Sequence, residues 1–338
     1  MSTIHKLLIL ILFTLNSPGV ALSQKANEDQ SLPTTAKEEA LVLLVNKMSL
    51  KAKLLTWPSP GQPGKMLGEF RVAIGKAEGD KQKEGDNKTP EGIYFTEKII
   101  PGYKLPSKYG ANAIPLNFPN PIDRLKGKTG HGIWLHGVEN NTRIEQAMIT
   151  EGCVAFYNED ISALAKILTP KQSIVIITSS SSQGQLGAST AAIQKAHSTW
   201  FNAWQERDME TYINSYQKDF TFNSMNLKGY RKYKERIFQS YNHITITQSD
   251  LKVFIHEDYA LSTASQAFYG DSRYKSIGLK HLYWKKTSGN HWEIIFEDFK
   301  QRLVKHKTIS PQDIRQSLLQ SPSRKYWSKI PRLPNDSL

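Results

Sequence analysis

Two hydrophobic patterns divide the chain at about residue 180. Up to that point, short apolar runs and alternating apolar and polar positions predict strands. These strands cover residues 41–45, 70–74, 93–95, 133–135 and 173–178. One helix is predicted, with Asn158 as its N-cap and a stop at Thr169-Pro170. The first part is therefore expected to be mostly β, with the charged, glycine-containing stretch 75–92 as an exposed loop.

The pattern changes after a stretch rich in serine and glycine at 179–189, which is typical of a flexible linker. Aromatic and apolar residues then recur at helical spacing, and this set comprises Ile193, Ala196, Trp200, Trp204, Tyr212, Tyr216, Tyr230, Tyr233, Ile237 and Tyr241. Candidate strands follow at 244–246, 259–269, 279–284 and 291–299. Helices followed by antiparallel strands predict an α+β domain over 190–306. Residues 307–338 contain four prolines and are expected to form a loosely attached tail.

The first 23 residues have the pattern of an export signal. A short polar and basic start precedes the apolar run 7–15, and Ala21-Leu22-Ser23 offers small residues for cleavage. A membrane-spanning helix needs about 20 apolar residues, so this run predicts no transmembrane anchor. Residues 24–40 are expected to be a flexible lead-in. The mature protein is therefore predicted to be exported to the periplasm.

Composition narrows the classes of function. The 338 residues are 39% hydrophobic and 22% charged, which excludes collagen-like, coiled-coil and wholly disordered chains and favours two domains. The 44 Lys and Arg residues against 31 Asp and Glu give a net charge of +13, but they are scattered, so no nucleic-acid partner is predicted. For an exported protein, the expected anionic partners are cell-wall polymers and lipid surfaces.

The single cysteine, Cys153, excludes a disulfide within the chain and any site built from several thiolates. The other histidines, including His131, show no metal-ligand spacing, so neither a metal nor a cofactor is predicted. A lone cysteine is more often a small buried hydrophobic residue than a nucleophile. Export favours a use for it, because an unpaired thiol is a liability in an oxidising compartment.

One constellation fits a cysteine nucleophile. Such a residue needs a base, usually histidine, and backbone N–H groups aimed at the developing oxyanion. His136 ends a predicted strand and Cys153 begins another apolar element, so the two side chains can meet. Gly152 permits a tight turn at the nucleophile, and Gly137 permits close approach of the backbone beside the base. These residues predict Cys153 as nucleophile and His136 as base.

The same residues resemble a known family. His136-Gly137 followed by Thr150-x-Gly152-Cys153-Val154 is similar to the signature of the L,D-transpeptidase (YkuD-type) catalytic domain. Thr89-Pro90-Glu91-Gly92-Ile93-Tyr94 looks like a stretch that these domains carry upstream. The resemblance covers roughly residues 40–178, and we assign 41–178 to this domain. The expected fold class is a mostly-β YkuD-type catalytic domain followed by an α+β domain.

The resemblance implies a cysteine enzyme that acts on peptidoglycan stem peptides. Cys153 would attack the L,D bond between diaminopimelate and the terminal D-alanine of a tetrapeptide, which gives a thioester. His136 would be the base, and the Gly137 carbonyl would orient its imidazole. The amides of Gly152, Cys153 and Val154 would form the oxyanion hole.

Two further positions bear on the substrate. Trp134, two residues before His136, would line the pocket or else be a core aromatic residue on its strand. Most members of the family have arginine two residues after the cysteine, where this chain has Ala155 as the substrate-binding position. The change removes a cation expected to engage a substrate carboxylate. It puts crosslinking in doubt more than formation of the acyl-enzyme.

Residues 190–306 resemble an NTF2-like fold, and the resemblance is carried by Trp200-Phe201-x-x-Trp204, Arg207-Asp208, Tyr212 and Asp219-Phe220. An export signal, a YkuD-type domain and an NTF2-like domain together look like the cell-shape L,D-carboxypeptidases of curved and helical bacteria. In those enzymes water resolves the thioester, which trims tetrapeptides to tripeptides. The NTF2-like domain is expected to hold substrate or to form a homodimer.

Three functions are consistent with the sequence. The first is an L,D-carboxypeptidase, a hydrolase in which water receives the acyl group. The second is an L,D-transpeptidase that passes the acyl group to an amine, which gives wall crosslinks or protein attachment. The third is a wall-binding module without turnover, in which Cys153 is structural. Ala155 and the NTF2-like domain favour the first.

Overall fold

The computed structural model describes residues 40–57, 65–180, 186–257, 259–271, 274–287, 291–301, 311–319 and 321–323. The predicted export signal at 1–23 and the lead-in up to residue 39 lie outside the described residues. Among the helices of the described part, none is both long and apolar enough to cross a membrane. Below, the first domain means residues 40–180 and the second domain means residues 186–301.

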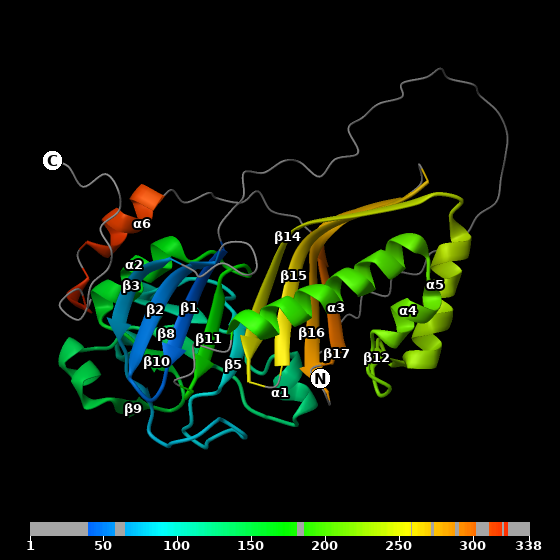
Figure 1. The fold of residues 1–338 in the computed structure, drawn as a ribbon. Coiled ribbons are helices and arrows are strands. Elements are labelled where there is room, and N and C mark those ends of the chain that lie inside the picture. Colours follow the sequence, from blue (N-terminus) through cyan, green and yellow to red (C-terminus); the bar gives the residue numbers. More distant parts are fainter. Residues whose placement is uncertain are drawn as a thin grey trace, which may run out of the picture. The chain divides into compact units, whose positions relative to one another are not determined.

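A five-stranded sheet forms one side of the core of the first domain (Figure 1). In spatial order its strands are β3 (Met66–Arg71), β2 (Lys51–Trp57), β1 (Ala40–Asn46), β11 (Ile174–Thr178) and β5 (Gly92–Phe95). β1 and β11 run parallel, and the other neighbouring pairs are antiparallel. Along β11, Val175 and Ile177 face the core of this domain, whereas Ile174 and Ile176 pack against the second domain. Burial on both faces explains the unbroken apolar run.

A four-stranded sheet forms the other side of the same core. In spatial order its strands are β10 (Val154–Ala155), β8 (Trp134–His136), β7 (Asn112–Pro115) and β6 (Ile100–Pro101). Short elements complete the domain: β4 (Ile74–Gly75), β9 (Met148–Thr150), α1 (Pro121–Leu125), α2 (Asn158–Ile167), and the 3-10 turns η1 (Gly102–Lys104), η2 (Ser107–Tyr109) and η3 (Asn141–Gln146). Leu54 of the first sheet, Leu135 of the second and Leu164 of α2 belong to one buried cluster.

Most of the predicted strands are confirmed, but the one at 70–74 is divided. β3 ends at Arg71, and Ile74 begins β4. Between them the Val72 amide donates to the Leu50 carbonyl, and Ala73 forms a bridge with Ala155. The first bond extends the pairing of β3 with the β2 side by one residue, and the bridge to Ala155 then replaces that pairing.

The predicted N-cap of α2 is wrong. The N-cap is Tyr157, and Asn158 is the first helical residue. The side chain of Asn158 does not bond to its own helix, because its amide is used by the backbone of Ala111 and Val138.

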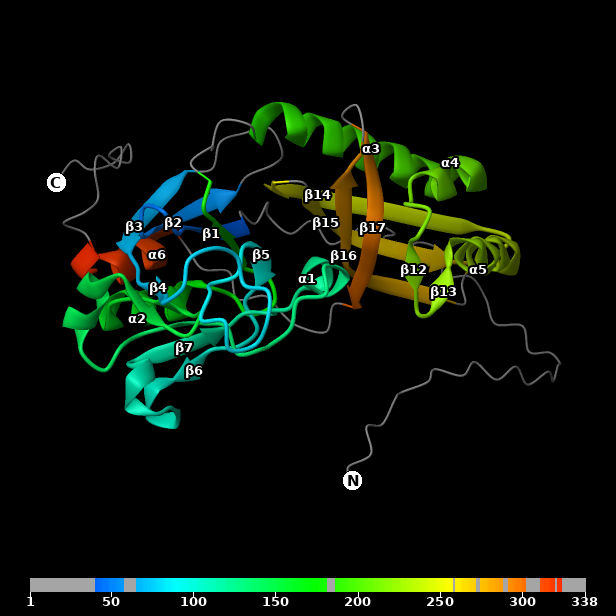
Figure 2. The same ribbon diagram turned by 90° about the horizontal axis from the view of Figure 1, so that it is seen from below.

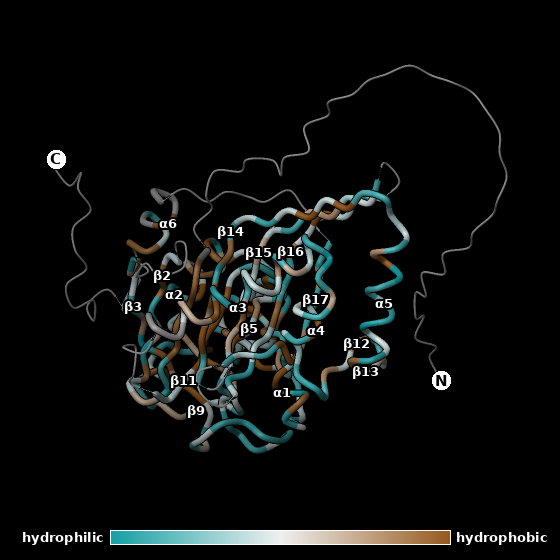
Figure 3. The backbone as a smooth tube through the Cα atoms, turned by 45° about the vertical axis from the view of Figure 1, so that its right-hand side comes forward, coloured by the Kyte–Doolittle hydropathy of each residue, from teal (hydrophilic) through white to brown (hydrophobic). Residues whose placement is uncertain are grey.

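The second domain consists of helices followed by a four-stranded antiparallel sheet, as predicted. The helices are α3 (Leu186–Glu206), α4 (Met209–Asn214) and α5 (Leu227–Ser240), and the sheet comprises β14 (Ile244–His256), β15 (Tyr259–Gly270), β16 (Tyr274–Lys286) and β17 (Trp292–Gln301). A short hairpin pairs β12 (Thr221–Phe222) with β13 (Met225–Asn226). α3 lies across one face of the sheet (Figure 2), and α5 is mostly hydrophilic (Figure 3). The predicted linker at 179–189 ends earlier than expected, since α3 begins at Leu186.

The two domains share a buried apolar cluster and specific hydrogen bonds. Ile93 and Ile174 of the first domain pack with Leu261 of the second. The Tyr259 hydroxyl accepts from the Ile93 amide at 2.6 Å, and the Trp57 indole donates to the Val253 carbonyl at 3.2 Å. These buried contacts hold the second domain against the face of β11 and β5 that points away from the core of the first domain.

The prediction of a loosely attached tail is wrong for residues 311–323. Helix α6 (Pro311–Leu318) places Ile314 and Leu318 in the core of the first domain. Beyond the helix, the hydroxyls of Ser321 and Ser323 each donate to the carboxylate of Asp160 at 2.5 Å. Asp160 is completely buried on α2, and burial raises its pKa. The prolines suggested a loose tail, but the segment also contains Ile314 and Leu318, an apolar pair spaced by four residues. It further contains two serines that donate hydrogen bonds to the buried Asp160.

The double substitution of Ser321 and Ser323 by alanine is expected to destabilise the first domain by about 2–4 kcal/mol, because a buried carboxylate loses both hydroxyl donors. Urea unfolding should show a lower midpoint with an unchanged slope. Gln316→Ala, on the exposed side of the same segment, is the matched control. Equal midpoints for the double variant and the control would show that the hydrogen bonds of the two serines to Asp160 contribute no stability.

Candidate active site

The pairing of β8 with β10 brings the predicted nucleophile and base to one face of a sheet. The strands are parallel, with Val154 opposite Leu135 and Ala155 opposite His136. Leu135 and Val154 are completely buried in the core. Since side chains alternate along a strand, Cys153 and His136 lie on the opposite face, as diagonal neighbours. An imidazole ring can span the distance between such neighbours.

The orientation of His136 is fixed by the next residue. Its Nδ1 lies 2.5 Å from the carbonyl oxygen of Gly137. A carbonyl can only accept, so Nδ1 carries the proton and Nε2 keeps its lone pair. Burial lowers the pKa of His136 to about 4, although the hydrogen bond to Gly137 acts in the opposite direction. The imidazole is therefore neutral at pH 7 and able to accept a proton at Nε2.

The turn before Cys153 requires glycine. Gly152 has a φ of +123°, and a Cβ there would lie 2.7 Å from the carbonyl oxygen of Lys88. The hydroxyl of Thr150 accepts from the Gly152 amide at 3.1 Å and donates to the Cys153 carbonyl at 2.7 Å. Of the three amides expected around an oxyanion, that of Gly152 is thus directed to Thr150 in this structure. Thr150 holds the turn, a role that the sequence signalled only through its spacing from Gly152.

The thiol of Cys153 is neutral in this environment. Its Sγ lies 3.4 Å from the carbonyl oxygen of Gly132 and donates to it. Burial raises the pKa of Cys153 to about 11, against a smaller lowering by the backbone of Trp134. Cys153 and His136 are therefore both neutral at pH 7, as a thiol and an imidazole rather than a thiolate and an imidazolium.

Aromatic side chains border the same face. Trp134 is half-buried, and its ring lies 4.9 Å from that of Tyr109. The Tyr109 and His136 rings meet edge to face with their centroids 5.2 Å apart, and Lys108 Nζ lies 5.1 Å from the centroid of the Tyr109 ring. Trp134 therefore borders the face of Cys153 instead of entering the core. Tyr109 and Lys108 come from η2, and no motif in the sequence pointed to them.

Comparison with known proteins identifies both domains. Residues 43–177 match the family model of the L,D-transpeptidase catalytic domain (YkuD), and residues 192–298 match that of the Cds6 C-terminal NTF2-like domain. The chain carries an L,D-transpeptidase domain followed by an NTF2-like domain. This confirms the expected fold class.

Individual relatives cover different parts of the chain. YafK of Escherichia coli K12 is 33% identical over 91 residues, which are 27% of this chain and 32% of YafK. The structure of Bd1075 from Bdellovibrio bacteriovorus covers 80% of this chain and 96% of its own, with 27% identity and a TM-score of 0.68. The helical cell shape determining protein Pgp2 from Campylobacter jejuni shares the fold, with 24% identity, a TM-score of 0.62, and coverage of 77% and 92%.

The expectation that Ala155 of the L,D-transpeptidase domain lies at a substrate-binding position is wrong. Its methyl group is completely buried and packs with Val138, Ile144 and Tyr157. The backbone of Ala155 forms a bridge with Ala73. The position faces packed protein, so its side chain is not available to a substrate.

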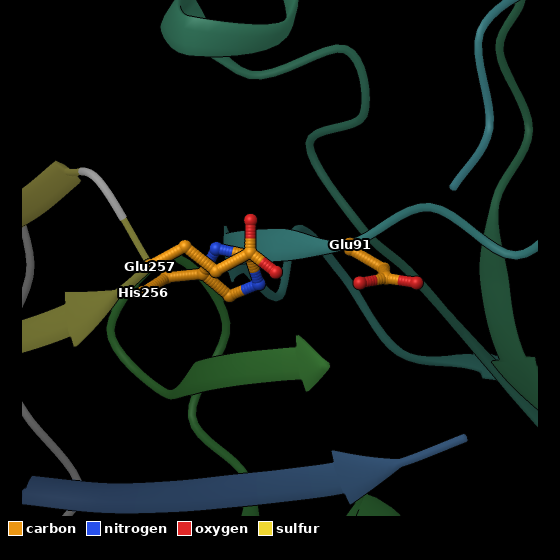
Figure 4. A group of neighbouring side chains, drawn as sticks. All are labelled: Glu91, His256 and Glu257. Carbon is orange, nitrogen blue, oxygen red and sulfur yellow. The ribbon is translucent and has the colours of Figure 1, made fainter. Parts of the chain in front are cut away.

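Where the L,D-transpeptidase domain meets the NTF2-like domain, Glu91, His256 and Glu257 place ligand-type atoms within 4.8 Å of one another (Figure 4). Glu91 already accepts from the Lys47 ammonium at 2.8 Å and from the Ser179 hydroxyl at 2.7 Å. His256 Nε2 donates to a backbone carbonyl. An ammonium group in contact with the carboxylate opposes a cation, so these residues do not fit a metal site, and the absence of a metal stays a prediction.

The NTF2-like domain encloses a charged network that the sequence did not reveal. Glu297 is buried and pairs with Lys280 at 2.7 Å. It also accepts from the hydroxyls of Tyr216 and Tyr230. Burial alone would raise the pKa of Glu297, but the lysines and hydroxyls overcome this and hold it at about 2. The helical spacing of Tyr216 and Tyr230 predicts only that they lie on the apolar faces of helices.

Lys234 adds a second buried cation to this network. Its Nζ lies 4.6 Å from the Trp204 ring and 5.2 Å from the Tyr230 ring. Within the described residues it has no hydrogen-bond or ion-pair partner, and burial lowers its pKa to about 8. Two lysines and one glutamate therefore leave the interior of the NTF2-like domain with excess positive charge at neutral pH.

Alkylation of Cys153 by iodoacetamide is expected to accelerate about tenfold per pH unit between pH 7 and pH 10, because only the thiolate reacts and its pKa is about 11. Intact-protein mass spectrometry measures the rate without interference, since the chain has one cysteine. The urea-unfolded chain is the control, and its rate should level off above an ordinary thiol pKa of about 8.5. A native rate that is already constant between pH 7 and pH 8 would indicate a thiolate–imidazolium pair instead.

Proposed function

We propose that this protein is an exported peptidoglycan L,D-carboxypeptidase in which Cys153 is the nucleophile. It would cleave the bond between diaminopimelate and the terminal D-alanine of tetrapeptide stems, leaving tripeptides. The observation that carries the proposal is the arrangement of Cys153 and His136 on one face of an L,D-transpeptidase domain, with Nδ1–H of the histidine held by Gly137.

Acylation begins with the neutral pair. As Sγ of Cys153 attacks the scissile carbonyl carbon, its proton moves to Nε2 of His136. The tetrahedral intermediate then collapses, the C–N bond breaks, and the imidazolium gives its proton to the departing amine of D-alanine. The acyl group remains on Cys153 as a thioester. A neutral thiol suits this sequence, because attack and proton transfer occur together.

Deacylation repeats these steps with water. Nε2 of His136 accepts a proton from the attacking water, and the C–S bond breaks as the carboxylic acid forms, which then loses its remaining proton to solvent. The thiol recovers its proton from the imidazolium. Thr150 and Gly152 hold the turn throughout, and the Cys153 and Val154 amides are the proposed donors to the oxyanion.

The acceptor and the second domain are also part of the proposal. Structural likeness to a helical cell shape determining protein supports a role in cell shape through trimming of stems. A substrate-holding role for the NTF2-like domain, with anionic wall polymers as the expected partners, stays a prediction. Homodimer formation through that domain stays a prediction. Transfer to an amine is the alternative, and a non-catalytic wall-binding module is the second alternative.

Incubation of the purified protein with tetrapeptide muropeptides is expected to give tripeptides and free D-alanine, which mass spectrometry resolves. Cys153→Ala should lose at least a thousandfold in rate, because no other thiol is present. Met48→Ala, a change at an exposed position, is the control for handling. New crosslinked dimers would establish the transpeptidase instead, and unchanged muropeptides with the wild-type protein would favour the binding module.

A further inference from the structure

We infer that Asn158 is a positioning residue for His136, acting through the peptide group of Gly137. The inference rests on the proposed function in one respect, namely that His136 is the base. It adds a residue that touches neither the thiol nor the imidazole, and it explains what keeps the Gly137 carbonyl aimed at Nδ1.

The side-chain amide of Asn158 forms hydrogen bonds with both backbone groups of Val138, two residues after His136, and with the amide of Ala111. Its Nδ2 donates to the Val138 carbonyl at 2.7 Å, and its Oδ1 accepts from the Val138 amide at 3.3 Å. The same Oδ1 accepts from the Ala111 amide at 2.8 Å. Both backbone groups of Val138 are thereby tied to one rigid planar group, which restricts rotation of the preceding Gly137 peptide.

Two glycines provide the space for this amide. A Cβ on Gly137 would lie 2.2 Å from Asn158 Oδ1, and a Cβ on Gly110 would lie 2.1 Å from it. Gly110 also has a φ of +63°. Neither position tolerates a side chain while the amide stays in place, so the backbone on both sides is fitted to Asn158.

Asn158 is itself held firmly. Its amide donates to Asn141 Oδ1 at 2.9 Å, and its carbonyl accepts from the Ser162 hydroxyl at 2.7 Å. It begins α2, whose Ile161 and Leu164 are completely buried in the core. The position of the imidazole therefore follows from the packed helix through Asn158, Val138 and Gly137. The Asn158 side chain bonds to the backbone of Ala111 and Val138, outside α2.

Removal of the amide releases the Gly137 carbonyl. The imidazole can then place its proton on Nε2, which leaves no lone pair for the thiol proton. For Asn158→Ala we expect kcat to fall about 10–100-fold, the range typical of groups that orient metal-bound histidines, with KM within a factor of about two. Asn158→Asp keeps the acceptor for the Ala111 and Val138 amides but loses the donor, so it should recover part of the loss.

The test combines kinetics on tetrapeptide muropeptides with proton–nitrogen NMR of the histidine rings, the His136 signals being assigned by their loss in His136→Ala. The wild-type protein should show His136 protonated at Nδ1, and Asn158→Ala should show a shift of the proton toward Nε2. Lys166→Gln, an exposed change on the same helix, should alter neither measurement. The NMR result decides the inference even if the wild-type protein cleaves no muropeptide.

Two outcomes would overturn the inference. One is Asn158→Ala with the wild-type kcat and an unchanged His136 tautomer. The other is a loss of activity in Asn158→Ala and Asn158→Asp alike while the tautomer stays as in the wild type. If Asn158→Ala does not fold, the tautomer and kcat of Asn158→Asp decide between the same results.

Discussion

The parallel pairing of β8 with β10 is the constraint on which the rest of the site depends. It is specified by burial, because Leu135 and Val154 must face the core together. A slip of one residue on either strand would turn a core residue outward and move Cys153 or His136 to the wrong face. The hydrophobic core thus sets the geometry of the two reactive side chains.

Around this pairing, the structure uses short polar side chains to fix backbone groups. Thr150 closes the turn at Cys153, and Asn158 closes the segment after His136. In both places the backbone needs a glycine: Gly152 has a positive φ, and a Cβ on Gly137 would overlap Asn158 Oδ1. Burial keeps the thiol and the imidazole neutral. The proposed reaction therefore depends on the relative placement of these two groups and not on a preformed thiolate.

The sequence was sufficient for the fold class, because apolar periodicity and the two glycine motifs are local signals. The same signals marked the strand ends that carry His136 and Cys153, whose catalytic roles stay a prediction. It was insufficient for contacts that bring distant segments together. Asn158 has the residue type of an N-cap, and only the tertiary fold shows that its amide is directed to Val138. The serines near the C-terminus have meaning only beside Asp160. Tyr109 and Lys108 lie in a turn that carries no recognisable motif. The residues around the buried Glu297 have the spacing of amphipathic helices and strands, so the sequence pattern gave no sign of a charged interior.

The central claim is that a thioester forms on Cys153, and hydroxylamine tests it most directly. Hydroxylamine should intercept the thioester during cleavage of a tetrapeptide muropeptide, so that part of the product is the tripeptide hydroxamate, rising with hydroxylamine concentration. Cys153→Ala should give neither hydroxamate nor D-alanine. Release of D-alanine by the wild-type protein with only the free tripeptide acid at every hydroxylamine concentration, or undiminished release by Cys153→Ala, would contradict the account.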